Sequence, residues 1–277
     1  MKATIETASG VAAPVAPAKR ESRACPVCNR SDCSPLFECD GWPLVQCGGC
    51  GLAYMPEVPT DEAIDTDFEW SESFARERYE RWMRNPFARA YTMAVLFLKP
   101  SREGRAMRLV KRYVSGGKLI DVGCGDGRML MHARRAGFDA IGVEPSAKMA
   151  ARAARRVGPE NVKVGRLQDF DFAPSSVDAI ITVSYVEHEP RPAAAMREFF
   201  KLLRPGGYCI QKTPNYDSRL RTLLGQRWSG YRFPEHVQYF NGSTFGRLMR
   251  EAGFEIAGVH ANPFGDNFWV AARKPKN

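Results

Sequence analysis

The pattern of hydrophobic and polar positions is most regular in the second half of the chain. From Lys118 onward, short apolar runs alternate with segments that repeat apolar residues three or four positions apart. The first pattern is typical of buried strands and the second of amphipathic helices. The predicted strands lie at 119–122, 140–143, 162–164, 177–183, 208–211, 254–259 and 268–272, and the predicted helices at 128–136, 146–157, 193–203 and 243–252. Strands separated by helices predict a doubly wound, mostly parallel sheet covered on both faces.

The residues ahead of this region follow other patterns. Ala, Pro and Thr dominate the first residues without apolar periodicity, which is typical of a disordered tail. Apolar residues at helical spacing predict a helix over 101–114. We therefore expect a tail at 1–22, a cysteine-rich module at 23–58, a helical lid or connector at 59–117, and a sheet domain at 118–277 with an insertion at 213–240.

Composition and charge narrow the class of protein. Hydrophobic residues make up 44% and charged residues 26% of the chain, as in ordinary globular proteins. The longest apolar run is too short to span a bilayer, and no apolar signal core follows Lys2. These features predict a cytoplasmic protein without a membrane span. The formal charge of +9 is spread along the chain, so a solvated basic surface and attraction to nucleic acid both remain open.

A glycine-rich turn follows the first predicted strand of the sheet domain. The segment LIDVGCGDGRML over 119–130 places three glycines between a strand and a helix, where the backbone can turn sharply and approach a ligand. The pyrophosphate-binding fingerprint G-x-G-x-x-G is not matched, because Arg128 stands where its third glycine would be. Asp121 at the strand end would repel a pyrophosphate and attract a cation. The turn therefore favours S-adenosylmethionine, which carries an ammonium and a sulfonium.

An acidic residue also ends the second strand of this domain. Glu144 follows Ile141-Gly142-Val143, and a carboxylate at this place can accept hydrogen bonds from both hydroxyls of a ribose. By itself this feature fits either class of nucleotide ligand. Together with Asp121 and the glycine turn, it supports the S-adenosylmethionine interpretation.

These motifs resemble those of the class I S-adenosylmethionine-dependent methyltransferase family over roughly residues 101–274. The similar segments are LIDVGCGDG, GVEPS, VDAIITVSYVEH and LLRPGGYCIQKTPN, with FWVAARKP as the antiparallel last strand. The resemblance implies a seven-stranded Rossmann-like fold. It also implies that Asp121, Gly123 and Gly125 hold the methionine part of the donor and that Glu144 holds its ribose.

One position departs from the pattern of that family. Many relatives carry a Gly-Asp pair after the third strand, near the adenine, whereas this chain has Gly165-Arg166. Further donor contacts are therefore expected from neighbouring positions and from the end of the fourth strand. The candidates are Leu167, Gln168, Asp169 and Ser184.

Six of the eight cysteines lie in one short window near the N-terminus. Cys25-Pro-Val-Cys28 and Cys47-Gly-Gly-Cys50 are two C-x-x-C pairs, separated by 18 residues. Two such knuckles at this spacing are typical of a four-cysteine zinc ribbon, and four thiolates leave no open position, so a structural Zn²⁺ is expected. The module resembles zinc-binding segments of some sugar methyltransferases and some ribosomal RNA methyltransferases.

Two histidines are the candidates for a catalytic base. His188 follows the fourth strand in VEHEP, and His236 lies in FPEHV within the insertion. Histidine suits proton transfer from an oxygen nucleophile near neutral pH. A structural role for each histidine remains an alternative.

Polar and aromatic residues at strand ends and in the insertion are candidates for acceptor binding. Long connections at the ligand edge of a sheet usually build binding surface. The candidates are Tyr185, Asn215, Arg219, Trp228 and Tyr231. A helical cover with its aromatic residues in the core is the alternative.

Three functions are consistent with these features. The favoured one is an enzyme that methylates a small-molecule or saccharide-type acceptor, with O-methylation expected. An RNA methyltransferase whose zinc ribbon aids RNA binding is the first alternative, and a non-catalytic zinc-dependent interaction protein is the second. The oligomeric state is not indicated by the sequence.

Overall fold

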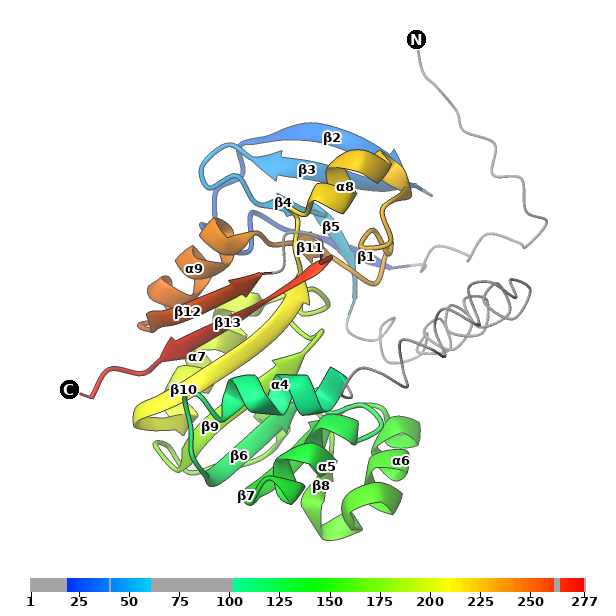
Figure 1. Cartoon of the computed structure of the whole chain (residues 1–277). Helices are drawn as coiled ribbons and strands as arrows, with labels where there is room; N and C mark the ends of the chain where they lie inside the picture. The colour runs from blue at the N-terminus through cyan, green and yellow to red at the C-terminus, as the bar shows by residue number, and fades with distance from the viewer. Residues whose placement is uncertain (1–18, 40, 61–101, 262–264, 277) are drawn as a thin grey trace.

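The computed structural model describes residues 19–39, 41–60, 102–261 and 265–276 (Figure 1). Most of the predicted tail at 1–22 and of the predicted lid at 59–117 lies outside these residues. No helix in the described ranges has the length and apolar character that a bilayer crossing requires. The boundaries proposed for the four segments therefore stay predictions.

A seven-stranded sheet forms the centre of the molecule, in the order β12-β13-β10-β9-β6-β7-β8. Its strands are β6 (Gly117–Val122), β7 (Phe138–Glu144), β8 (Val162–Val164), β9 (Val177–Val183), β10 (Leu203–Pro214), β12 (Glu255–Ala261) and β13 (Asn267–Arg273). The neighbours from β8 to β10 pair in parallel, and β13 runs antiparallel to both β10 and β12. The predicted Rossmann-like sheet is confirmed.

Helices cover both faces of this sheet. They are α4 (Arg102–Val110), α5 (Arg128–Arg135), α6 (Ala147–Val157), α7 (Pro192–Leu202) and α9 (Gly242–Glu251). Helix α8 (Arg219–Leu224) belongs to the insertion and lies apart from this sheet (Figure 1), and short 3-10 turns occur at η1 (Pro159–Asn161), η2 (Leu167–Asp169) and η3 (Gly225–Arg227). Apolar side chains of α4 and α5 share one core cluster, and those of α7 and α9 share another. Ser146 caps α6, because its side chain accepts a hydrogen bond from the Met149 backbone N–H.

A second, smaller sheet contains strands from two distant parts of the chain. Its order is β11-β4-β3-β2, with β2 (Cys33–Cys39), β3 (Trp42–Cys47), β4 (Ala53–Tyr54) and β11 (Gln238–Tyr239), while β1 (Arg20–Ser22) pairs with β5 (Glu57–Pro59). β11 belongs to the insertion and pairs antiparallel with β4 of the cysteine-rich module. The insertion therefore completes the sheet of the module.

Arg23 joins the cysteine-rich module to the larger domain. Its guanidinium donates hydrogen bonds to the backbone carbonyls of Met55, Pro190 and Val237 and to the side-chain oxygen of Gln238, at 2.6 to 2.9 Å. Burial lowers the pKa of Arg23 to about 10, so the side chain stays charged at neutral pH. One cation thus links the module, the β9–α7 loop and the insertion.

Candidate active site and four-cysteine cluster

The glycine turn lies between β6 and α5, at the carboxyl end of the parallel strands. Gly123 and Gly125 have φ angles of 71° and 55°, a region that glycine adopts without a steric penalty. A Cβ on Gly123 would lie 3.3 Å from a ring carbon of Tyr185. The backbone N–H of Gly123 donates to the Val143 carbonyl at 2.9 Å, which anchors the turn to β7.

Asp121 presents a buried carboxylate beside this turn. Its side chain is 1% exposed, and among the described residues Oδ2 has no hydrogen-bond partner. Burial, assisted by the charge of Glu144, raises the pKa of Asp121 to about 7. A buried oxygen without a partner is costly. A cationic ligand at this edge would supply the missing partner.

Glu144 holds the other side of the turn. Oε2 accepts a hydrogen bond from the Gly125 N–H at 2.8 Å, and Oε1 accepts one from the Ser146 N–H at 3.0 Å. Burial raises the pKa of Glu144, and these two backbone hydrogen bonds oppose that rise. Each oxygen keeps a second lone pair, so the carboxylate can still accept the two hydroxyls of a ribose. The residues present therefore fit a ligand with an ammonium and a ribose.

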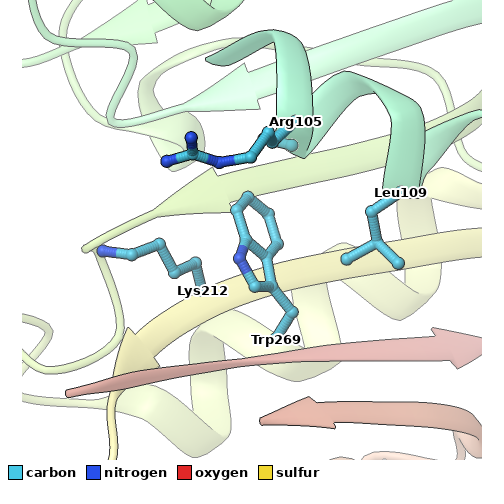
Figure 2. A pocket seen from close by; sticks show the side chains of 5 residues that line it. Arg105, Leu109, Lys212 and Trp269 are labelled. Atoms are coloured by element: carbon cyan, nitrogen blue, oxygen red, sulfur yellow. The ribbon is translucent and has the colours of Figure 1, made fainter. Parts of the chain in front are cut away.

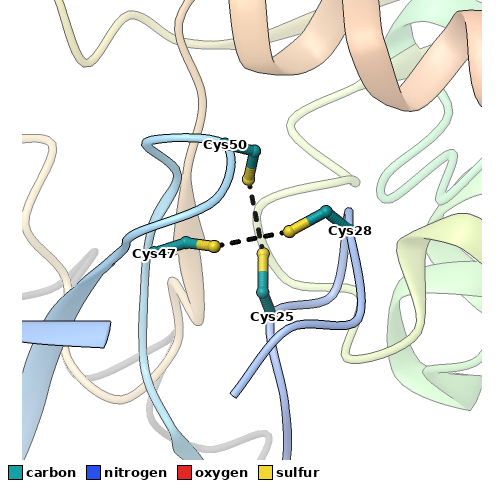
Figure 3. A group of neighbouring side chains, drawn as sticks. All are labelled: Cys25, Cys28, Cys47 and Cys50. Atoms are coloured by element: carbon teal, nitrogen blue, oxygen red, sulfur yellow. Dashed lines mark hydrogen bonds between the residues drawn. The ribbon is translucent and has the colours of Figure 1, made fainter. Parts of the chain in front are cut away.

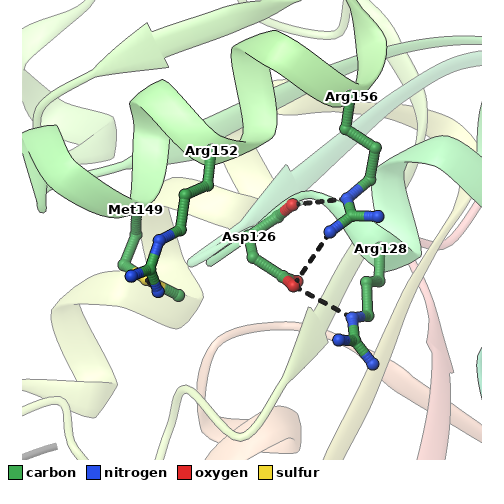
Figure 4. A network of polar contacts seen from close by, with 5 residues as sticks. All are labelled: Asp126, Arg128, Met149, Arg152 and Arg156. Atoms are coloured by element: carbon green, nitrogen blue, oxygen red, sulfur yellow. Dashed lines mark hydrogen bonds and ion pairs between the residues drawn. The ribbon is translucent and has the colours of Figure 1, made fainter. Parts of the chain in front are cut away.

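Ion pairs fix the start of α5 against α6. Asp126 accepts hydrogen bonds from Arg128 at 2.9 Å and from Arg156 at 3.2 Å, and Arg156 also donates to the Asp126 backbone carbonyl (Figure 4). Arg128 is the residue that breaks the pyrophosphate fingerprint. Here its guanidinium serves to hold the glycine turn.

The four residues predicted to contact the donor after β8 and β9 lie in different environments. Leu167 is buried, whereas Gln168 and Asp169 are exposed. Asp169 Oδ2 accepts a hydrogen bond from the Arg166 N–H at 2.7 Å, so this acid closes the η2 turn. Ser184 has a φ of 59° and its hydroxyl accepts a hydrogen bond from Lys212 Nζ at 3.2 Å. The donor contacts of these four residues stay predictions.

The two candidate histidines lie side by side. The rings of His188 and His236 have centroids 4.7 Å apart and meet edge to face. His236 is 3% exposed, and its Nδ1–H donates to the Gly230 carbonyl at 2.8 Å, which leaves the lone pair on Nε2. Burial lowers the pKa of His188 to about 4, helped by the charge of Arg232. Burial, with the same arginine and His188, also lowers the pKa of His236 well below its usual value.

Glu187 is adjacent to this pair. It is 1% exposed, and its Oε2 accepts a hydrogen bond from Thr213 at 3.0 Å. The backbone carbonyl of Glu187 accepts a hydrogen bond from the Val237 N–H, so the β9–α7 loop is tied to the insertion. Burial raises the pKa of Glu187, and its own backbone N–H and the charge of Lys212 oppose that rise. The sequence did not single out this residue.

The five residues predicted to bind the acceptor do not lie together, and two of them pack inside the protein. Trp228 is 1% exposed and donates its indole N–H to Asp266 at 2.8 Å, and Tyr231 packs edge to face on it. Both rings belong to an aromatic cluster between the insertion and the cysteine-rich module. The helical-cover alternative therefore describes the packing of Trp228 and Tyr231.

The remaining three candidates are closer to the surface or to the glycine turn. Tyr185 faces Gly123 and donates its hydroxyl to Glu189 at 2.8 Å. Asn215 caps the turn before α8, and Arg219 begins that helix on an exposed position. Their roles toward an acceptor stay predictions.

A pocket of about 300 Å³ opens between α4 and the sheet. It is lined by Arg105, Ala106, Leu109, Lys212 and Trp269. Figure 2 shows Arg105 and Leu109 reaching from α4 toward Lys212 and Trp269 on the sheet. None of these five residues was predicted from the sequence, although a lysine within the apolar strand β10 is a signal that could have pointed to the pocket. Lys212 connects the pocket to the site, because it bonds Ser184 and lies near Glu187 and His236.

The four predicted cysteine ligands converge at one point (Figure 3). Sγ of Cys25 lies 3.5 Å from Sγ of Cys50, and Sγ of Cys28 lies 3.4 Å from Sγ of Cys47. These separations exclude disulfides, whose sulfurs are about 2.05 Å apart, and approach the ~3.8 Å edge of a tetrahedral zinc–thiolate site. All four sulfurs lie within 4.8 Å of one another. The geometry is compatible with a metal ion.

Backbone groups favour the thiolate form at one of these cysteines. Burial opposes ionisation of Cys47, but the backbone N–H groups of Cys50 and Gly49 and the Cys28 thiol lower its pKa to about 7. The Gly49 N–H lies 3.3 Å from the Cys47 sulfur. Such hydrogen bonds orient and stabilise metal-bound thiolates.

Comparison with known proteins agrees with this geometry. Residues 98–259 match the family described as "Methyltransferase domain", which covers more than half of the chain. The ubiquinone biosynthesis O-methyltransferase of Psychrobacter arcticus is 27% identical over 186 residues, which cover 57% of this chain and 68% of that protein.

Solved structures show the same fold. A methyltransferase of Thermotoga maritima superposes with a TM-score of 0.52 at 23% identity, covering 73% of this chain and 97% of the other. One from Mesorhizobium loti gives 0.50 at 19% identity, covering 62% and 98%. With Asp121, the glycine turn and Glu144 in place, the chain belongs to the methyltransferase domain family and is a class I S-adenosylmethionine-dependent methyltransferase.

Proposed function

We propose that this enzyme O-methylates a small acceptor that carries a negative charge. The pocket lined by Arg105, Lys212 and Trp269 carries this proposal. Its volume of about 300 Å³ lies at the lower end of the range for ligand pockets. Two cationic side chains beside an indole suit a ring or sugar bearing a carboxylate or phosphate.

The donor side of the site supports the same proposal. When bound, S-adenosylmethionine supplies an electrophilic methyl group on a sulfonium. The Asp121 carboxylate would pair with its ammonium, and Glu144 would accept its ribose hydroxyls. Gly123 and Gly125 would let the backbone approach the ligand. The main task of these residues is to hold the methyl group in line with the acceptor oxygen.

The histidine pair would face the acceptor oxygen as neutral imidazoles. His188 has a pKa of about 4, and that of His236 is also lowered, so both rings offer lone pairs at neutral pH. His188 lies on the loop that follows Tyr185, which packs against the glycine turn, and His236 reaches it from the insertion. The name of the P. arcticus relative, an O-methyltransferase of ubiquinone biosynthesis, supports oxygen on a small molecule as the target.

The four-cysteine cluster would hold a structural Zn²⁺. Four thiolates fill a tetrahedral ion, so no position remains for a substrate. The module's strand β4 pairs with β11 of the insertion, which contributes His236 to the site. Zinc would thus support the active site through the fold.

Transfer of labelled methyl from S-adenosylmethionine into a heat-treated cell extract tests the proposed function. We expect label in a low-mass, ribonuclease-resistant fraction that binds an anion exchanger. The variant Lys212→Met should reduce this transfer at least tenfold, whereas Lys111→Met, at an exposed lysine, should not. Label that disappears from large material after ribonuclease treatment would overturn the small-molecule proposal in favour of RNA.

A further inference from the structure

Three potential metal ligands converge beside the acceptor pocket, far in the sequence from the cysteine cluster. One donor atom each from Glu187, His188 and His236 lies within 4.8 Å of the other two. Donors on one tetrahedral zinc ion with Zn–N bonds of about 2.1 Å are about 3.4 Å apart. Side-chain rotations that move each donor by roughly an ångström would bring them to that spacing.

An unsatisfied carboxylate oxygen points to a missing partner. Glu187 is 1% exposed, and Oε1 accepts no hydrogen bond from any described residue. Its other oxygen is held by Thr213 at 3.0 Å, which fixes the orientation of the carboxylate. A buried carboxylate oxygen without a partner is unfavourable unless an ion or ligand completes its environment.

Backbone carbonyls orient the two imidazoles as they do in metal sites. Nδ1–H of His236 donates to the Gly230 carbonyl at 2.8 Å, so Nε2 carries the free lone pair. His188 meets the backbone of Glu235 in the same loop. A hydrogen bond from one ring nitrogen to a carbonyl is the usual arrangement that fixes the tautomer of a metal-binding histidine.

Two cations near the cluster limit the net charge that it can hold. Lys212 lies close enough to influence Glu187 and His236, and Arg232 influences both histidines. Arg232 also forms an ion pair with Glu235, which offsets its charge. A divalent ion here would therefore depend on the Glu187 carboxylate and favour an anionic acceptor.

We propose that Glu187, His188 and His236 bind a divalent transition-metal ion such as Zn²⁺ next to the acceptor pocket. Two imidazoles and one carboxylate form a donor set that leaves a position open for a substrate oxygen. This role rests on the proposed function, in which the acceptor is an alcohol or phenol. The ion lowers the pKa of the acceptor hydroxyl, whose proton passes to water.

The methyl transfer then balances without a further reactant. A bond forms between the acceptor oxygen and the methyl carbon, and the bond from that carbon to the sulfonium sulfur breaks. The electron pair of the broken bond stays on the sulfur. The three residues take no part in bond making, and they position and polarise the oxygen through the ion.

Metal content of the full chain tests the site. The protein is loaded with Zn²⁺, passed through a desalting column and analysed by plasma emission. We expect about two zinc ions per wild-type chain and about one in Glu187→Gln, which keeps the shape of the side chain and can still bond Thr213. His260→Asn is the control, because His260 bonds Tyr113 outside the cluster, and it should retain both ions.

Substitution of Co²⁺ for Zn²⁺ identifies which site has lost its ion. The intense thiolate-to-cobalt absorption should persist in Glu187→Gln, which also shows that the variant is folded. One ion per wild-type chain, or two ions in Glu187→Gln, would overturn the metal site. Methyl transfer by protein holding one ion would leave the proposed function standing, whereas two ions without any transfer would overturn the proposed function alone.

Discussion

A single buried oxygen at Asp121 would couple protonation to the proposed binding of the donor. Its carboxyl has a pKa of about 7 because it is buried beside Glu144. In the donor-free chain, roughly half of the molecules therefore carry a proton on this group at neutral pH. Binding of an ammonium requires the carboxylate form, so the proton and the donor compete for the same oxygen.

Donor affinity should therefore decrease as the pH falls from 7 to 5. Below the pKa of Asp121, each unit of pH should weaken S-adenosylmethionine binding by up to about tenfold. Isothermal titration calorimetry at three pH values measures this slope. Asp121→Asn should bind weakly at all three values, and an unchanged wild-type affinity between pH 5 and 7 would contradict the assignment.

The same group should affect stability in the absence of donor. The folded-state pKa lies above the ordinary value of 3.8, so the folded chain retains a proton that the unfolded chain releases. The free energy of unfolding contributed by Asp121 is therefore highest below pH 4 and is lost as the pH rises to about 7. Urea titrations at pH 5 and 7 measure the free energy of unfolding. Its change between the two pH values should be smaller for Asp121→Asn than for wild type.

Arg23 determines how the elements around the site are joined. Its buried guanidinium satisfies the carbonyls of Met55, Pro190 and Val237 at once. These carbonyls belong to the module, to the loop after β9 and to the insertion. No local sequence pattern marks this arginine, because even the nearest partner of its guanidinium, Met55, is 32 residues away.

Replacing Arg23 should destabilise the whole arrangement. Arg23→Ala removes the guanidinium that the carbonyls of Met55 and Pro190 accept from and should cost about 3 kcal/mol of unfolding free energy. Arg30→Ala removes an exposed arginine of the same module, paired only on the surface with Asp32, and should cost less than about 1 kcal/mol. Chemical denaturation measures the free energy of unfolding of both variants. Equal losses would show that the buried contacts of Arg23 stabilise the fold no more than a surface ion pair does.

The two C-x-x-C knuckles should lose their order if the proposed Zn²⁺ is removed. Cys47→Ser deletes one thiolate of the cluster and should lower the melting temperature by several degrees, with less labelled methyl transferred. Cys33→Ser changes an exposed cysteine outside the cluster and serves as the control. Differential scanning fluorimetry with and without a strong chelator measures the effect, and a chelator-insensitive wild type would argue against a bound metal.

Regular elements of the sheet could be predicted because their signals are local. The run Val177–Val183 and the serine cap of α6 depend on neighbouring residues only. The roles of Asp121 and Glu144 as paired acids at adjacent strand ends follow from the same local pattern and from the parallel arrangement.

Contacts between distant segments could not be predicted in this way. Lys212 and Trp269 meet through the antiparallel pairing of β10 with β13, and His188 meets His236 through the folding of the insertion. Trp228 was expected at an acceptor surface, whereas it is buried against the cysteine-rich module. A segment of aromatic residues interleaved with arginines can form either an exposed lid or a buried cover. Hydrophobic periodicity therefore does not distinguish the two.

At the scale of the whole molecule, the two sheets are interdependent. The aromatic cluster between the small sheet and the insertion contains residues of β3, β4 and the insertion, among them Trp42, Tyr216, Trp228 and Tyr239. Each of these side chains is at most 9% exposed. The small sheet therefore has no complete apolar core without the insertion, and a second cluster joins its Val45 and Tyr54 to the core of the larger domain.

A chain that begins at residue 61 should fail to behave as an independent domain. It would expose Trp228 and Tyr239 and leave β11 without its partner β4. Size-exclusion chromatography should show aggregates or a partly unfolded species. A monomer with the melting temperature of the full chain would contradict the interdependence of the sheets.

The pairing of β11 with β4 has a consequence for folding during synthesis. Tyr239 lies opposite Ala53, so the ribosome must add more than 180 residues after β4 before its partner strand exists. Contacts of such long sequence separation form late and slow the overall folding rate. The proposed Zn²⁺ could bind the N-terminal knuckles soon after they emerge, but their sheet would stay open at one edge until the insertion has been made. The nascent chain would thus carry an unpaired strand edge through most of its synthesis, and a chaperone that shields such edges would raise the yield of native enzyme.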